Sequence, residues 1–258
     1  MQNLFDIAGK VAVVTGGSRG IGAMIARGFL EGGAKVYITA RKVDELNAAQ
    51  RELAVFGDCV AIPSDLSSVA GIEAFAGAIA EREEHLDILV NNAGATWGAP
   101  VESFPEKGWD KTMDLNVKAP FFLVQQLLPL LRAAAGQGER ARVINIGSVN
   151  GLSIDTAMQN FAYTASKAAI HHLTRHLAVE LAGAGINVNA IAPGLFPSQM
   201  TAYMMEVATE EQLSANFPIP RMGGLEDAAG TAIFLSSRAS EWMTGQVLAL
   251  DGGMVARG

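Results

Sequence analysis

The sequence predicts an α/β fold built on one parallel sheet, and three features lead to this prediction. Short apolar runs rich in β-branched residues alternate with longer stretches whose apolar residues recur at helical spacing. A glycine-rich turn follows the first run. Half of the 258 residues are hydrophobic and only 17% are charged, which is enough apolar material for a large core. These features favour strands that are covered by helices on both faces.

The two kinds of segment alternate along most of the chain. The expected strands span residues 10–15, 35–39, 58–62, 86–91, 142–147, 186–191 and 246–250. The expected helices span residues 20–31, 42–56, 67–84, 106–135, 161–183 and 225–237. Such alternation forms right-handed βαβ units. We therefore expect one doubly wound, seven-stranded parallel sheet, a single Rossmann domain over residues 1–258.

One segment, residues 196–220, interrupts the alternation. It contains a short amphipathic stretch, Thr201–Ala208, and three prolines at positions 197, 218 and 220. A helical insert next to a site is a candidate lid over the substrate, in which Tyr203, Met204 and Met205 would form a soft apolar wall. The alternative is that the insert simply packs against the domain.

The glycine-rich turn lies between the first strand and the first helix, as Gly16-Gly-Ser-Arg-Gly20-Ile-Gly22. Glycines permit a tight turn and a close approach of the backbone to phosphate, and the start of a helix favours negative charge. The spacing Gly-x-x-x-Gly-x-Gly differs from the commoner Gly-x-Gly-x-x-Gly. The turn still predicts a site for the pyrophosphate of a dinucleotide.

Tyr163 and Lys167 lie four residues apart in an expected helix, and so on one face of it. A free tyrosine titrates near pH ~10, and a nearby ammonium lowers that pKa. The pair is therefore a candidate acid and base. Other polar or glycine-containing motifs, at Asn92, Ser148 and Pro193, stand just past expected strands. Ligands of open parallel sheets bind at that edge.

Taken in order, these motifs resemble those of the short-chain dehydrogenase/reductase family. The resemblance extends from about residue 8 to Gly253 and is closest to the branch of 3-oxoacyl-(acyl carrier protein) reductases. Within it, Ala192–Thr201 is similar to the reductases linked to rhamnolipid synthesis. The motifs that carry the resemblance are Thr15–Gly22, Asn91–Gly94, Asn116, Ser148, Tyr163-x-x-x-Lys167 and Pro193-Gly194.

The resemblance implies a role for each catalytic candidate. Tyr163 would donate a proton to the carbonyl oxygen as hydride arrives, and Ser148 would donate a hydrogen bond to the same oxygen. Lys167 would lower the pKa of Tyr163 and bind the nicotinamide ribose. Asn116 would hold a water that links Lys167 to solvent.

The residue after the second expected strand distinguishes the two nicotinamide cofactors. An acidic side chain there binds the 2′-hydroxyl of NAD, whereas arginine accepts the 2′-phosphate of NADP. Here Ala40 and Arg41 follow the strand, Arg19 lies in the glycine turn, and no acid comes before Asp44. Two guanidinium groups suit a phosphate dianion. We therefore predict NADP(H), the alternative being that both arginines are only solvated.

The remaining cofactor contacts follow from the resemblance: Asp65 and Leu66 would hold the adenine, and the residues after Pro193 the nicotinamide. The full predicted set is Gly16, Ser18, Arg19, Gly20, Ile21, Gly22, Arg41, Asp65, Leu66, Asn92, Ala93, Gly94, Tyr163, Lys167, Pro193, Gly194, Phe196 and Ser198.

The expected reaction is the NADPH-dependent reduction of a ketone to a secondary alcohol, with a 3-oxoacyl thioester or another β-keto compound as the substrate. Ser148 and Tyr163 are fifteen residues apart, more than in most reductases of the branch, which weakens the transfer of that substrate. An apolar pocket is expected from Trp97, Leu152, Ile154, Met158 and Phe196. The alternatives are a sugar, polyol or other alcohol dehydrogenase and, more distantly, a regulator that binds NADP(H) without turnover.

Composition excludes other classes of partner. The net charge is -7 and no basic patch is present, so neither nucleic acid nor an anionic membrane is expected as a partner. Cys59 is the only cysteine, no signal peptide or spanning segment is visible, and a cytoplasmic location is expected. No metal site is expected, although His172, His176 and Glu180 share a helix face. The resemblance implies that this face packs in a homotetramer.

Overall fold

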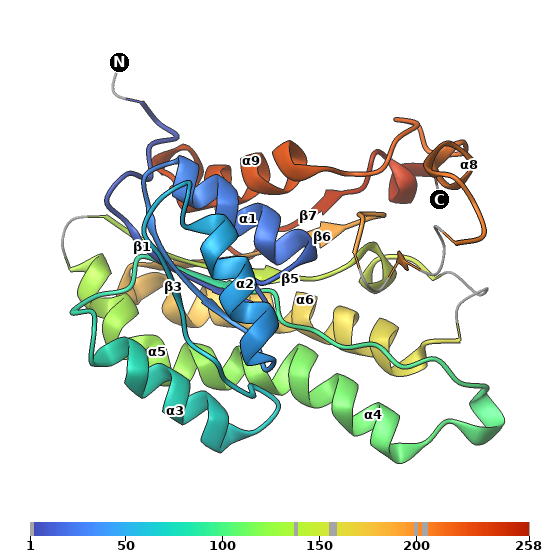
Figure 1. Ribbon diagram of the computed structural model, residues 1–258, viewed down its shortest axis with the longest axis horizontal. Coiled ribbons are helices and arrows are strands. Elements are labelled where there is room, and N and C mark those ends of the chain that lie inside the picture. The colour runs from blue at the N-terminus through green and yellow to red at the C-terminus, as the bar shows by residue number, and fades with distance from the viewer. Residues whose placement is uncertain (1–2, 137–138, 155–158, 199–200, 203–205, 258) are drawn as a thin grey trace.

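Seven parallel strands form a single sheet in the order β3-β2-β1-β4-β5-β6-β7 (Figure 1). The computed structural model describes residues 3–136, 139–154, 159–198, 201–202 and 206–257. The strand order reverses between β1 and β4, which is where ligands of doubly wound sheets bind. The strands are β1 Val11–Thr15, β2 Lys35–Thr39, β3 Cys59–Ala61, β4 Ile88–Asn91, β5 Ala141–Ile146, β6 Ile186–Pro193 and β7 Val247–Leu250.

Helices cover both faces of the sheet (Figure 1). Helices α1, α2 and α9 contribute to the core on one face, and α3, α5 and α6 to the core on the other. The helices are α1 Gly20–Glu31, α2 Val43–Leu53, α3 Val69–Ala80, α4 Glu106–Met113, α5 Ala119–Ala135, α6 Phe161–Leu181, α8 Glu210–Ser214 and α9 Leu225–Ser236.

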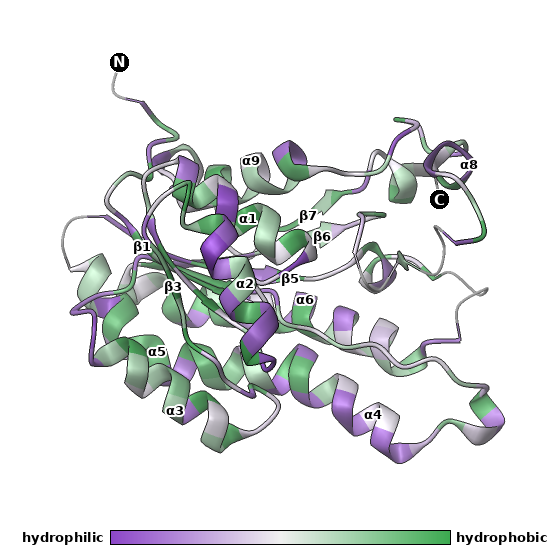
Figure 2. Cartoon of the chain, viewed as in Figure 1, coloured by the Kyte–Doolittle hydropathy of each residue, from purple (hydrophilic) through white to green (hydrophobic). Residues whose placement is uncertain are grey.

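Because helices cover both faces of the sheet, a strand needs apolar residues at successive positions. In β1, Ala12 and Val14 belong to the core under α1 and α9, whereas Val11 and Val13 belong to the core under α3 and α5. Successive side chains of a strand point to opposite faces, so both faces must be apolar. Strand β1 is accordingly hydrophobic, whereas β5 and β6 also contain hydrophilic residues and α2 and α4 carry many of them (Figure 2).

The sequence predictions of the elements are confirmed with two differences. All seven strands form, but the expected helix 106–135 is divided by a π-helical turn, Asp114–Lys118, because the Asn116 side chain bonds to the loop after β4. In the insert, the described helix is α8, which Thr209 caps, and Glu206–Ala208 form a turn and bend. Tyr203, Met204 and Met205 lie outside the described residues.

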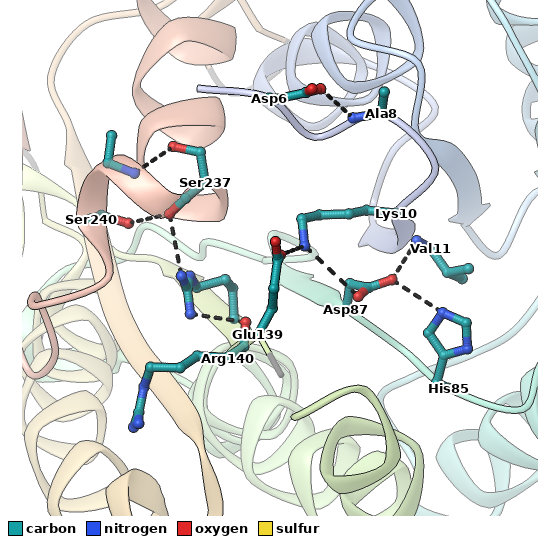
Figure 3. A network of polar contacts seen from close by, with 12 residues as sticks. Asp6, Ala8, Lys10, Val11, His85, Asp87, Glu139, Arg140, Ser237 and Ser240 are labelled. Atoms are coloured by element: carbon teal, nitrogen blue, oxygen red, sulfur yellow. Dashed lines mark hydrogen bonds and ion pairs between the residues drawn. The ribbon is translucent and has the colours of Figure 1, made fainter. Parts of the chain in front are cut away.

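A polar network ties the strands together at their amino-terminal ends, opposite the site (Figure 3). The carboxylate of Asp87 accepts a hydrogen bond from the Val11 N–H at 2.8 Å. Lys10 forms ion pairs with Asp87 and Glu139, and the Arg142 guanidinium donates to the carbonyl of Ser237. This network fixes where β1 begins relative to β4 and β5.

We predict that Asp87→Ala lowers the free energy of unfolding by about 1–3 kcal/mol, because the Val11 N–H loses its acceptor in a half-buried place. Asp58→Ala is the matched control, since the Asp58 side chain is 64% exposed and lies 3.9 Å from Lys35. Urea unfolding of both variants measures the difference. Equal losses in the two variants would contradict the role given to Asp87.

Candidate active site

A cavity of about 310 Å³ opens at the carboxyl-terminal edge of the sheet. Its walls come from the segments that follow β1, β2, β4, β5 and β6, together with the start of α6. Most of the sequence-predicted residues line it: Gly16, Ser18, Arg19, Gly20, Ile21, Arg41, Leu66, Asn92, Ala93, Gly94, Ser148, Tyr163, Lys167, Pro193, Gly194, Phe196 and Ser198. The structure thus brings together motifs from the whole length of the chain.

The turn between β1 and α1 requires its glycines. Gly16 and Gly20 have φ angles of 63° and 54°, a region that other residues rarely adopt. A Cβ atom on Gly22 would lie 2.3 Å from the Asn92 amide nitrogen and 2.4 Å from the Gly16 carbonyl oxygen. Gly22 is not among the residues that line the cavity and its place requires close packing, while the cofactor contact predicted for it stays a prediction.

Side-chain hydrogen bonds hold this turn against the end of β4. The Asn92 amide donates to the Thr15 carbonyl at 2.8 Å, and the Thr15 hydroxyl accepts from the backbone N–H groups of Asn92 and Ala93. Helix α1 begins at Gly20, at the cavity wall. The free N–H groups of its first turn make this a ready site for an anion.

Asp65 stands between two residues that line the cavity, Ser64 and Leu66, and is not itself part of the lining. Its carboxylate accepts hydrogen bonds from the N–H and the hydroxyl of Ser67, so the side chain shapes the turn before α3. The adenine contacts that the resemblance implies for Asp65 and Leu66 stay predictions.

Lys167 is the most buried charged group of the cavity, with 6% of its surface exposed. Its ammonium donates a hydrogen bond to the Ile146 carbonyl at 2.8 Å, at the end of β5. It lies 5.5 Å from the centre of the Tyr163 ring. Burial lowers the pKa of Lys167 to about 8, because the charged form loses its hydration. Lysine and tyrosine therefore share one face of α6, as predicted.

The predicted effect of Lys167 on Tyr163 is wrong for this structure. Burial raises the pKa of Tyr163, and a hydrogen bond with the Ser148 side chain opposes that rise. The Lys167 ammonium is instead engaged with a backbone carbonyl. Loss of hydration around the Tyr163 phenol therefore decides the direction of its pKa, and the expected effect of the Lys167 ammonium does not. The contact between Ser148 and Tyr163 places two hydroxyl groups together at the cavity wall.

Asn116 lies beneath the cavity rather than in its wall. Its amide donates to the Ala95 carbonyl and to the Ser166 hydroxyl, both at 2.9 Å, and its oxygen accepts from the Ala95 N–H at 2.8 Å. The side chain therefore braces the loop after β4 against α6. These contacts give Asn116 a positioning role, and the water that the sequence predicts at this residue stays a prediction.

His171 was missed by the sequence analysis, although it follows Lys167 by one helical turn. Its imidazole is 2% exposed, and its Nε2 atom accepts a hydrogen bond from the Ser148 N–H at 3.4 Å. A Cβ on Gly147 would lie 2.0 Å from that nitrogen, and one on Gly151 would lie 2.8 Å from the ring. The ring thus fills the space that two glycines leave beneath Ser148.

Glu45 and Lys42 were also missed. The Glu45 carboxylate lies 2.8 Å from the Arg19 guanidinium and 2.5 Å from the Lys42 ammonium, and all three residues line the cavity. The absence of an acid before Asp44 therefore does not keep a carboxylate away from Arg19. The reason is that α2 begins at Val43, so its first turn brings Glu45 back toward the glycine turn.

The predicted apolar wall is only partly formed by the described residues. Phe196 lines the cavity. Trp97 packs on Gly108 of α4 and under Lys111, while Leu152 and Ile154 are exposed. Met158 lies outside the described residues.

Two further features bear on the kind of site. In the described part of the chain, no group of three or more histidine, cysteine, aspartate or glutamate side chains could hold a metal ion. No described helix combines the length and the apolar character that crossing a bilayer requires.

Known proteins resemble this chain over nearly its whole length. A family model described as enoyl-(acyl carrier protein) reductase matches residues 16–255. The rhamnolipid biosynthesis 3-oxoacyl-(acyl carrier protein) reductase of Pseudomonas aeruginosa is 52% identical, covering 98% of this chain and 99% of that protein. The gluconate 5-dehydrogenase of Gluconobacter oxydans is 38% identical, over 98% and 97% of the two chains.

A solved structure, the Pseudomonas aeruginosa RhlG/NADP active-site complex, resembles this chain with a TM-score of 0.94. The two sequences are 52% identical, and the match covers 99% of this chain and 100% of that one. The fold predicted from the sequence is therefore confirmed by a neighbour of known structure as well as by the sheet topology.

The buried state of His171 predicts how stability depends on pH. Burial, with a contribution from Lys167, lowers the pKa of His171 from 6.5 to about 4. The unfolded chain takes up this proton near pH 6.5 and the folded chain only near pH 4. The contribution of the neutral ring to the free energy of unfolding is therefore complete above pH 6.5. It is lost as the pH falls toward 4.

We predict that His171→Gln flattens the acid-side decline of the unfolding free energy by about 3 kcal/mol between the two pKa values. His172→Gln is the matched control, because His172 is the exposed neighbour on the same helix. Urea unfolding at a series of pH values measures the slopes. A variant of His171 that keeps the slope of the unaltered protein would contradict this assignment.

Proposed function

The chain belongs to the short-chain dehydrogenase/reductase family, and we propose that it reduces a ketone to a secondary alcohol with NADPH. The observation that carries the proposal is the convergence of Ser148, Tyr163 and Lys167 in one cavity beside a glycine turn. The two relatives described above are a reductase and a dehydrogenase, and the chain is an oxidoreductase of this kind. A regulator that only binds the nucleotide would not need this constellation.

The cavity has the features that a dinucleotide phosphate requires. The start of α1 and the positive φ angles of Gly16 and Gly20 form a cradle for a pyrophosphate. Arg19, Arg41 and Lys42 supply positive charge beside the residues that follow β2. We therefore assign the adenosine end to the region between α1 and α2, and the nicotinamide end to the region of Pro193, Gly194, Phe196 and Ser198.

Bound NADPH would supply the hydride, and the protein would supply a proton and orientation. In our scheme the Tyr163 hydroxyl donates its proton to the carbonyl oxygen, and Ser148 donates a hydrogen bond to the same atom. Burial keeps the pKa of Tyr163 high, so the phenol holds its proton until it is needed. Lys167, with a pKa of about 8, remains largely charged at neutral pH, and its ammonium would bind the nicotinamide ribose.

The proposed substrate is a 3-oxoacyl thioester or another β-keto compound. The similarity to the Pseudomonas aeruginosa reductase and the apolar ring of Phe196 in the cavity wall support this class. The gluconate 5-dehydrogenase relative supports a keto-sugar as the second candidate. The segment 196–220 would act as a lid, its start held by the Thr201 hydroxyl, which donates to the Phe196 carbonyl at 2.8 Å.

We further propose a homotetramer in the cytoplasm. Phe121 on α5 and Val179 on α6 are exposed large apolar residues on the helices that would pack between subunits, and both are expected to become buried there. The single cysteine, Cys59, is buried and free, which fits a reducing compartment.

A panel of ketones tests the substrate class. We expect NADPH oxidation, followed by absorbance, to be fastest with acetoacetyl and longer 3-oxoacyl thioesters. A β-keto ester, a diketone and a keto-sugar complete the panel. Turnover of the keto-sugar alone would replace the substrate assignment and leave the mechanism intact.

Tyr163→Phe is the control for the chemistry in the same assay. It should lower kcat by about a hundredfold or more, because a general acid contributes roughly 10²–10⁴ to the rate. NADPH binding should change little. Near-normal turnover by this variant would refute the scheme, and NADPH binding without turnover of any ketone by the unaltered protein would favour the regulator.

Arg41→Ala tests the cofactor assignment. We expect kcat/KM to fall about tenfold or more with NADPH and to change little with NADH, because only NADPH carries the phosphate that the guanidinium would hold. The ratio of the two kcat/KM values, measured with one ketone, is the readout. Equal losses with both cofactors would contradict the assignment.

A further inference from the structure

We propose that Glu45 is a counterion built into the subsite for the 2′-phosphate, where it limits the preference for NADPH, and that Lys42 is a third cation of that subsite. The inference rests on the proposed function, because it assumes that a 2′-phosphorylated nucleotide binds in the cavity. Neither residue occupies the position after β2 from which cofactor preference is usually predicted.

Glu45 joins the two cations in one cluster. One carboxylate oxygen lies 2.8 Å from the Arg19 guanidinium and the other lies 2.5 Å from the Lys42 ammonium. Among the described residues that line the cavity, Glu45 is the only acidic one. The hydrogen bond from Lys42 lowers the pKa of Glu45, so the carboxylate is charged at neutral pH.

The charge balance of the cluster explains what Glu45 would do. Arg19, Arg41 and Lys42 carry three positive charges into this end of the cavity, and Glu45 removes one of them. A phosphate dianion can therefore be matched by the cluster as it stands. The phosphate must also compete with the Glu45 carboxylate for the hydrogen-bond donors of Arg19 and Lys42. The two negative groups repel each other as well.

The exposure of the cluster makes this competition reversible. The side chains of Glu45, Arg19 and Lys42 are 43%, 51% and 71% exposed, so each can move without breaking the core. Exposed ion pairs contribute little to stability. The carboxylate can therefore hold the two cations near the glycine turn and release them when a phosphate binds. In this role Glu45 lowers the affinity for NADPH but does not prevent its binding.

The same turn of α2 provides a matched control. Asp44 and Glu45 both lie in the first turn, where either carboxylate favours the positive helix end. Asp44 does not line the cavity in the described part of the chain. A change that acts only through the helix would affect both residues alike, whereas the proposed role belongs to Glu45.

The test is equilibrium binding to the purified full-length protein and its variants, with no ketone present. Dissociation constants for NADPH and NADH are measured at fixed salt for the unaltered protein, Glu45→Gln and Asp44→Asn. We expect Glu45→Gln to bind NADPH about three- to tenfold more tightly, with NADH affinity within about twofold. Asp44→Asn should change neither dissociation constant. Lys42→Ala should weaken NADPH binding by about three- to tenfold.

Small nucleotide probes locate the effect. Glu45→Gln should bind adenosine 2′,5′-bisphosphate more tightly and 5′-AMP unchanged. The inference is overturned if Glu45→Gln fails to raise the affinity for NADPH or raises the affinity for NADH equally. It is also overturned if Asp44→Asn has the same effect as Glu45→Gln. An unaltered protein that does not bind NADPH would contradict the proposed function itself, whereas the other results leave that function standing.

Discussion

The burial of the Lys167 ammonium is the constraint on which the rest of the site depends. No ion pair to a carboxylate compensates this charge within the described residues, and its hydrogen bond goes to the Ile146 carbonyl. A charge in such a place is costly unless it is paired and hydrogen-bonded, so the carbonyl that accepts its bond must be held in place. The fold supplies that support by tying α6, which carries both Tyr163 and Lys167, to the ends of the strands.

Buried hydrogen bonds make those ties on either side of Lys167. Ser166 accepts from Asn116, and Thr174 accepts from Asn145, which in turn accepts from Asn91 in β4. Such bonds restrict the arrangement of the helix, although the buried side-chain oxygen of Asn91 has no hydrogen-bond partner. The reaction end of the cavity is thus backed by buried hydrogen bonds, whereas the ion pairs of Arg19, Lys42 and Glu45 at its other end are exposed.

Sequence reasoning succeeded where a pattern is local. The strands, the glycine turn and the spacing of Tyr163 from Lys167 each follow from neighbouring residues, and all appear in the structure. It failed where the partner is distant. Glu45 meets Arg19 across 26 positions, Ser148 meets His171 across 23, and Asn116 meets Ala95 across 21. Nothing in a single sequence pairs such residues, and the π-helical turn at Asn116 follows from one of those contacts.

The most direct test of this account is the titration of Lys167 by carbon-13 NMR in lysine-labelled protein, with Lys167→Arg to assign its signal. Burial predicts a pKa of about 8, well below the ordinary value of 10.5. That result would place the charge in the water-poor setting that the hydrogen bond to the Ile146 carbonyl implies. A value at or above 10.5 would mean that the ammonium is solvated or paired with an acid, and would contradict the account.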